Sequence, residues 1–109
     1  MPCGAPAICN RSKAYDVLLR PVVPVAAFPH ETPQLTIDGS TLPSRHAVRA
    51  TAPFNLTGSP ALSVPFGWSA EGLPIGVQIV GRHFDEATIL RVGMALEQRH
   101  DATRRHPIP

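Results

Sequence analysis

Alternating apolar and polar residues in the second half of the chain predict two paired strands. Every second residue is apolar between residues 61 and 66 and again between residues 73 and 80, which places the apolar side chains on one face of a strand. In the first stretch these residues are Leu62, Val64 and Phe66. The intervening Ser-Ala-Glu-Gly, residues 69–72, is typical of a turn, so an antiparallel hairpin is expected. Pro65 has no N–H to donate, and it predicts that the first strand has a free edge or ends there.

The next segment changes period and predicts an amphipathic helix from Glu86 to Arg99. Its apolar positions are spaced three and four residues apart, and they are Ile89, Val92, Gly93 and Leu96. Glycine costs about 1 kcal/mol relative to alanine inside a helix, so Gly93 is expected where the helix approaches a sheet closely.

Four residues favour a helix start at this point. Asp85 is expected to cap the helix through its side-chain oxygen, and Glu86 favours the positive end of the helix dipole. Phe84 and Ile89 occupy the two positions of a hydrophobic staple.

The first half of the chain is interrupted more often. Ten of the 13 prolines precede residue 66, which indicates that regular structure is concentrated later in the chain. Residues 15–23 read as a short buried strand with a proline-rich exit, and residues 24–49 read mostly as loop with a turn at Asp38-Gly39. No residue between 50 and 70 is charged, but prolines interrupt this stretch, which predicts a buried irregular segment rather than a membrane span.

Composition places these elements in one small domain or in a piece of a larger one. The chain has 109 residues, of which 43% are hydrophobic, 17% are charged and 13 are proline, and its formal net charge is +2. A compact chain of this size buries about 65% of its unfolded surface.

The basic stretch from Arg99 to His106 contains an acidic residue and no aromatic residue, so we expect a solvated tail and no nucleic-acid site. Cys3 and Cys9 fit neither a disulfide framework nor a zinc site, and without a signal sequence the expected location is cytoplasmic.

Tests for catalytic motifs yield no site in the sequence. Ser69 lies in Gly-Trp-Ser-Ala-Glu, which departs from a nucleophile elbow at the last position, so it is expected to be a turn residue. Lys13 is the only lysine and no serine precedes it at the required spacing. Glu97 and His100 could face one metal ion, but two ligands are too few, and helix-end positions explain both. Asp85 and Glu86 are better explained by the helix start. The expectation is therefore no catalytic, cofactor-binding or metal-binding residue and no cofactor.

Four motifs between Thr51 and Gln98 carry a resemblance to a known family. They are P-F-N-L-T-G-x-P-A at Pro53 to Ala61, S-V-P at Ser63 to Pro65, G-L-P-I-G-V-Q-I-V-G at Gly72 to Gly81 and F-D-E-A-T-I-L-R-V at Phe84 to Val92. This run closely resembles the C-terminal end of amidase signature family enzymes. A weaker similarity reaches back to Tyr15, whereas residues 1–14 do not resemble the family. The resemblance divides the chain into an unmatched segment, 1–14, and a partial amidase domain, 15–109.

The resemblance implies an α/β fold. The chain is expected to form the C-terminal portion of an amidase-type α/β/α mixed-sheet fold, and this portion would consist of short strands, an antiparallel hairpin and one covering amphipathic helix. Members of the family hydrolyse amide C–N bonds with a serine nucleophile, a bridging serine and a lysine base. Their catalytic segments lie upstream of the portion matched here, so Lys13 does not inherit the role of the base. Glutamine amidotransferase subunits of the family carry an acidic residue where this chain has Val48, which favours an amide hydrolase lineage. Arg20 stands where the family usually has threonine.

Two hypotheses follow. The first is a partial amidase that carries architecture but no catalytic residue. The second is a non-catalytic interaction module, or a truncated fragment, that docks with another amidase part or associates with a second copy. This hypothesis is motivated by the predicted elements, because one hairpin and one helix leave a sheet face and a strand edge uncovered. The expected partners are the remainder of an amidase or a second copy, with no nucleic acid and no membrane.

Overall fold

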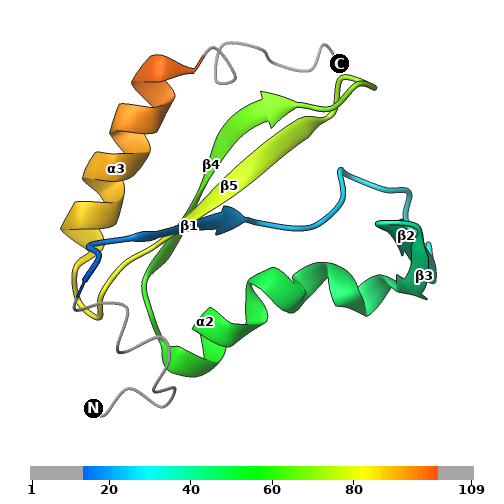
Figure 1. Cartoon of the computed structure of the whole chain (residues 1–109), viewed down its shortest axis with the longest axis horizontal. Coiled ribbons are helices and arrows are strands. Elements are labelled where there is room, and N and C mark those ends of the chain that lie inside the picture. Colours follow the sequence, from blue (N-terminus) through cyan, green and yellow to red (C-terminus); the bar gives the residue numbers. More distant parts are fainter. Residues whose placement is uncertain (1–13, 101–109) are drawn as a thin grey trace.

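A computed structural model describes residues 14–100, in which three short strands, two helices, two longer strands and a final helix follow one another (Figure 1). In chain order the elements are β1 (Leu18–Pro21), β2 (Gln34–Ile37), β3 (Ser40–Pro43), the 3₁₀ helix η1 (Ser44–Ala50), α2 (Ala52–Thr57), β4 (Ala61–Trp68), β5 (Pro74–Val80) and α3 (Glu86–Arg99). No helix in these residues is long and apolar enough to cross a membrane.

Three of the strands form an antiparallel sheet in the order β1-β5-β4. The predicted hairpin is confirmed, since β4 pairs with β5 across the turn at residues 69–72. Gly72 takes a positive φ of 80° in this turn, and its N–H donates to the carbonyl of Ser69 at 3.0 Å. Glycine adopts that backbone region without the steric cost that a side chain would bring.

The expected free edge of β4 is also confirmed, because in the described part of the chain β5 is its only neighbour. The pairing register shifts between Pro65 and Gly67, so Phe66 lies at a bulge. A strict period of two predicts Phe66 on the same face as Leu62 and Val64. The bulge breaks that alternation and leaves Phe66 exposed. The centroid of its ring lies 4.3 Å from the centroid of the His100 ring.

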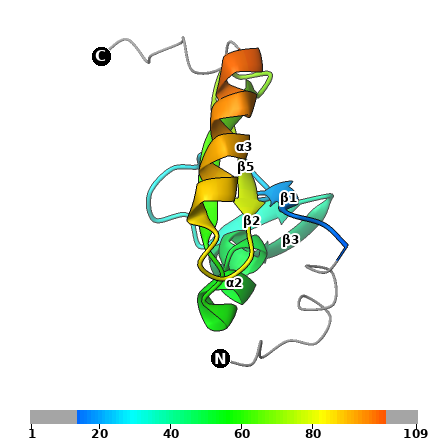
Figure 2. The same ribbon diagram turned by 90° about the vertical axis from the view of Figure 1, so that its left-hand side faces the viewer.

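Helix α3 covers one face of the sheet and forms the main core with it (Figure 2). The buried residues of this core are Val64, Ile79 and Ile89, and the partly buried residues around them are Val17, Leu62, Val77, Val92 and Leu96. The predicted apolar face and both predicted ends of the helix are confirmed. Gly93 lies where the prediction put it, since a Cβ atom there would be 2.6 Å from Leu62 Cδ2.

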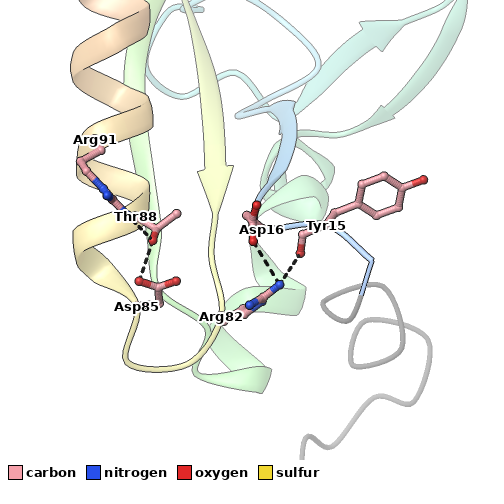
Figure 3. Close-up of polar contacts among 6 residues, drawn as sticks. All are labelled: Tyr15, Asp16, Arg82, Asp85, Thr88 and Arg91. Atoms are coloured by element: carbon pink, nitrogen blue, oxygen red, sulfur yellow. Dashed lines mark hydrogen bonds and ion pairs between the residues drawn. The ribbon is translucent and has the colours of Figure 1, made fainter.

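The start of α3 differs from the prediction at two residues. Asp85 precedes the helix but makes no side-chain cap to the backbone. Its Oδ1 instead accepts a hydrogen bond from Thr88 Oγ1 at 2.7 Å (Figure 3). The predicted staple is wrong, because Phe84 has a φ of 62° and its residue surface is 92% exposed, while Ile89 is buried in the core. The left-handed backbone turns the aromatic ring outward.

The first half is more regular and less buried than predicted. β1 is not a buried strand, since Leu19 is 51% exposed. Residues 24–49 contain the hairpin β2–β3, turned at the predicted Asp38-Gly39, followed by η1. Residues 50–70 are not irregular, because α2 and β4 occupy most of them. Figure 1 shows α3 on one side of the three strands and α2 with the β2–β3 hairpin on the other.

Candidate functional site

Ser69 is a turn residue, as predicted, and its hydroxyl organises the β4–β5 turn. The N–H of Leu73 donates to Ser69 Oγ at 3.2 Å, while the N–H of Ser69 donates to the carbonyl of Leu73 at 2.8 Å. Hydrogen bonding from the Ser69 side chain, with help from the Glu71 backbone, lowers the pKa of the exposed Glu71 carboxyl below its usual value. The hydroxyl therefore serves the loop, since it bonds both the Leu73 backbone and the Glu71 carboxyl of the same turn.

The acidic residues and histidines of α3 do not gather into a site. Asp85 and Thr88 form a short polar chain with Arg91, whose Nη2 donates to Thr88 Oγ1 at 3.2 Å (Figure 3). His100 lies against Phe66 just after the helix end. Within residues 14–100 no group of three His, Cys, Asp or Glu side chains could hold a metal ion.

An ion pair ties the segment before β1 to the segment after β5. Arg82 Nη2 donates to Asp16 Oδ1 at 3.2 Å and to the carbonyl of Tyr15 at 3.4 Å (Figure 3). The side chains are 44% and 81% exposed, so solvent screening keeps the contribution of this pair to stability small. The ion pair holds the residues that precede β1 next to the residues that follow β5.

Three polar residues form a row across the sheet face opposite α3. Arg20 of β1 pairs with Gln78 of β5, and Gln78 pairs with Ser63 of β4. Their neighbours in sequence, such as Ile79 and Leu62, belong to the α3 core. Because side chains alternate between the faces of a sheet, Arg20, Gln78 and Ser63 share the other face. We call these three residues the polar row.

The polar row contains a cation and an acceptor without ordinary partners. Arg20 is half-buried, and its guanidinium carbon lies 5.4 Å from the centroid of the Phe54 ring of α2. In the part of the chain that the structure describes, Arg82 with Asp16 is the only ion pair, so no carboxylate there neutralises Arg20. Gln78 is 6% exposed, and its Oε1 is buried without a hydrogen-bond partner among the described residues.

Sequence reasoning singled out Arg20 but missed its surroundings. The signal for Gln78 was a single polar residue within the apolar run at residues 73–80. The signal for Ser63 was its place between Leu62 and Val64 in the alternating pattern. The strand order β1-β5-β4 brings Arg20, Gln78 and Ser63 together. The alternation of apolar and polar residues within each strand does not predict that order.

The predictions that concern Lys13, Cys3 and Cys9, and the tail after His100, lie outside the described residues. Val48 lies in η1 with 55% of its surface exposed, and its carbonyl accepts a hydrogen bond from Thr51 Oγ1 at 3.1 Å. Its apolar side chain offers no charge to a substrate amine.

Comparison with known proteins supplies the deciding observation. The family model described as Amidase matches residues 7–90, most of the chain. The chain belongs to the amidase family. The match starts within residues 1–14, which the motifs had left unmatched, and it ends inside α3.

Curated relatives are longer than this amidase-family chain. It is 41% identical over 99 residues to a glutamyl-tRNA(Gln) amidotransferase subunit from Geobacillus stearothermophilus, a match that covers 91% of this chain and 19% of the relative. It is 40% identical over 104 residues to the uncharacterized protein in the nthA 5′ region of Rhodococcus erythropolis, covering 94% of this chain and 51% of that protein. The chain thus spans about a fifth of the amidotransferase relative. The hydrolase lineage inferred from Val48 remains a prediction.

Solved structures confirm the α/β fold of the family. An amidase crystal structure matches 84% of this chain and 21% of its own chain, with a TM-score of 0.80 and 33% identity. The structure of 6-aminohexanoate cyclic dimer hydrolase matches 90% of this chain and 22% of its own, with a TM-score of 0.75 and 32% identity. The described elements therefore correspond to one portion of a larger amidase fold.

Proposed function

We propose that this chain is the C-terminal part of an amidase that hydrolyses a carboxylic amide C–N bond, and that it contributes architecture but no catalytic residue. The family membership carries the proposal, together with one sequence fact. Lys13 is the only lysine of the chain, and it precedes every described element. A Ser–Ser–Lys mechanism needs a lysine base beside the nucleophile. The nucleophile, the bridging serine and the base therefore come from another polypeptide segment.

The described residues support an architectural role in this reaction. β4, β5 and α3 form the continuous core of the chain, and the polar row lies on the opposite sheet face. A catalytic segment packed beside α2 on that side of the sheet would leave the α3 core intact. The proposed location of the working enzyme is the cytoplasm, because the two cysteines fit no disulfide framework and suit a reducing compartment.

A direct assay of the purified chain tests the absence of catalytic residues. Incubation with simple primary amides, with ammonia release as the readout, is expected to show no turnover above buffer. A Lys13→Ala variant provides the matched control. Hydrolysis that survives both rigorous purification and this substitution would show that the chain carries catalytic residues of its own.

A second function, that of a non-catalytic docking module, is favoured by the exposed apolar surface. Seven hydrophobic residues in residues 14–100 are buried, whereas eleven large hydrophobic residues are exposed. The exposed residues are Tyr15, Leu19, Val23, Phe28, Val48, Leu56, Phe66, Ile75, Phe84, Leu90 and Met94. So many exposed apolar side chains are typical of a surface that another protein covers. Sedimentation as a monomer, with cooperative thermal unfolding, would count against this second function.

A further inference from the structure

We infer that the polar row is a recognition site for the carboxylate of a small amide substrate, with Arg20 as the residue that binds it. The inference rests on the proposed function only in calling the ligand a substrate. It depends on the sheet face opposite α3, where Arg20, Gln78 and Ser63 lie side by side in register.

The first step of the argument is the charge of Arg20. A half-buried guanidinium retains its charge at any physiological pH, and partial burial without an anion is costly. No acidic side chain among residues 14–100 pairs with it. An anion from outside these residues is therefore the partner that the position lacks.

The second step is the position of the guanidinium. Its carbon lies 5.4 Å from the centroid of the Phe54 ring, so α2 supports one side of the cation. The N–H donors of Arg20 make no hydrogen bond to other described residues, so they are available to a ligand. A planar donor fork held in one orientation fits the two oxygens of a carboxylate.

The third step is the neighbouring acceptor. Gln78 Oε1 is buried without a hydrogen-bond partner among the described residues, and the pairing register places Gln78 directly beside Arg20. A carboxamide can accept from a substrate N–H through its oxygen and can donate through its nitrogen. Beside a cation, it suits a ligand that carries an amide near its carboxylate.

The fourth step is the close packing beside Ser63. Gly76 lies two residues before Gln78 on the same face, and a Cβ atom at this position would be 3.2 Å from both Ser63 Oγ and Val22 Cγ2. The absence of that atom keeps the Ser63 hydroxyl clear of a steric neighbour. The hydroxyl has no hydrogen bond to other described residues, so it offers a further donor and acceptor next to Gln78.

The charge on this face favours a carboxylate over a phosphate ester. Of the three residues in the polar row, only Arg20 is charged. A single guanidinium balances the single charge of a carboxylate, whereas a phosphate monoester carries nearly two charges at neutral pH.

Titration of the ¹⁵N-labelled chain with succinamate, which carries one amide and one carboxylate, tests this inference by NMR. Butyramide serves as the neutral ligand of similar size, and inorganic phosphate serves as the general anion. Succinamate is expected to shift the Arg20 Nε–H and Gln78 side-chain amide signals, and butyramide is expected to leave them unchanged. Equal shifts with butyramide, or shifts as large and as tight with phosphate, would overturn the carboxylate assignment.

Substitutions then assign the effect to Arg20. Arg20→Gln is expected to weaken succinamate binding about tenfold or more, because a charge-assisted contact is lost. Arg82→Gln is the matched control, since Arg82 already pairs with Asp16, and it should bind like the parent chain. If Arg20→Gln loses its dispersed spectrum, Arg20→Lys keeps the charge without the fork, and it should bind more weakly than the parent. Parent-like binding by a folded Arg20→Gln or by Arg20→Lys would overturn the inference.

The two proposals fail in different ways. Specific succinamate binding by a chain that never supports amide hydrolysis would retain the site and reject the proposed function. Hydrolysis by a reassembled amidase with equal efficiency on succinamate and butyramide, unchanged by Arg20→Gln, would retain the function and reject the site.

Discussion

Gly93 is the residue at which α3 approaches the sheet most closely, and its missing side chain is part of the core packing. A Cβ atom there would be 2.6 Å from Leu62 Cδ2, 3.4 Å from Val64 Cγ1 and 3.7 Å from Ile79 Cδ1. Only the Leu62 methyl group must move to admit a methyl group, whereas a larger side chain meets all three neighbours. Gly93 therefore allows close packing of α3 on the sheet, although glycine has a lower helix propensity than alanine.

Gly93→Val is expected to destabilise the chain by about 1–3 kcal/mol through overpacking. Leu62→Ala opens space at the same point, so the double variant should lose less stability than the sum of the two single changes. Chemical denaturation of the four proteins of this cycle measures the coupling. Additive effects would show that the two positions are not in contact.

Glu71 is the residue whose titration reports the β4–β5 turn. Its folded pKa lies below the ordinary glutamate value, mainly because of the hydrogen bond from the Ser69 side chain. A lowered folded pKa stabilises the turn above the unfolded pKa, and this contribution is lost as the pH falls through the folded pKa. Acidification should therefore loosen the turn.

Ser69→Ala is expected to move the Glu71 midpoint up toward the ordinary value, as followed by NMR of the side-chain carboxyl carbon. Ser59→Ala changes a serine outside this turn and should leave the midpoint in place. An unchanged Glu71 midpoint in Ser69→Ala would show that the hydroxyl does not stabilise the charged carboxylate.

At the scale of elements, β4, β5 and α3 could be predicted because their signals are local and dense. The alternation, the turn residues and the change of period all lie within a few residues of one another. The sequence prediction lacks α2 because Pro53 reads as an interruption in it. Proline is tolerated in the first turn of a helix, where its missing N–H has no partner to lose.

A second missed signal was Gly58, which ends α2 with a left-handed φ of 67°. The strands of the β2–β3 hairpin are four residues long, too short for a clear period. The polar row could not be predicted because it depends on the pairing of β1 with β5, whose segments lie far apart in the sequence.

The start of α3 offers a prediction that separates strain from a staple contact. Phe84 holds a φ of 62° while its side chain is almost wholly exposed. Phe84→Gly should relieve the backbone strain and raise the free energy of unfolding by about 0.5–1 kcal/mol, once the greater entropy of unfolded glycine is subtracted. Thermal denaturation measures this gain.

Phe84→Ala is the matched control, because it removes the ring but keeps the strained Cβ, and it should give no comparable gain. A clear loss of stability in Phe84→Gly would instead indicate that the ring packs on Ile89 as a staple in solution.

At the scale of the whole molecule, one well-formed core adjoins a large incomplete surface. α3 buries one sheet face, while β4 has a free edge in the described part of the chain and many large apolar residues are exposed. The proposal that this chain is part of a larger amidase accounts for this combination, because further segments of such a fold would cover those residues.

The most direct test of this account is reconstitution of amide hydrolysis from two parts. One part would be the amidase relative of known structure, cut so that it ends before the residue that corresponds to Tyr15. This part would be assayed alone, with this chain, and with an Ile79→Asp variant of this chain, in which a charge at a fully buried position prevents the core from forming. We expect each part alone to be inactive, the mixture with this chain to assemble one to one and hydrolyse a primary amide, and the Ile79→Asp mixture to remain inactive. Turnover by this chain alone, or a stable one-to-one complex without turnover, would contradict the account.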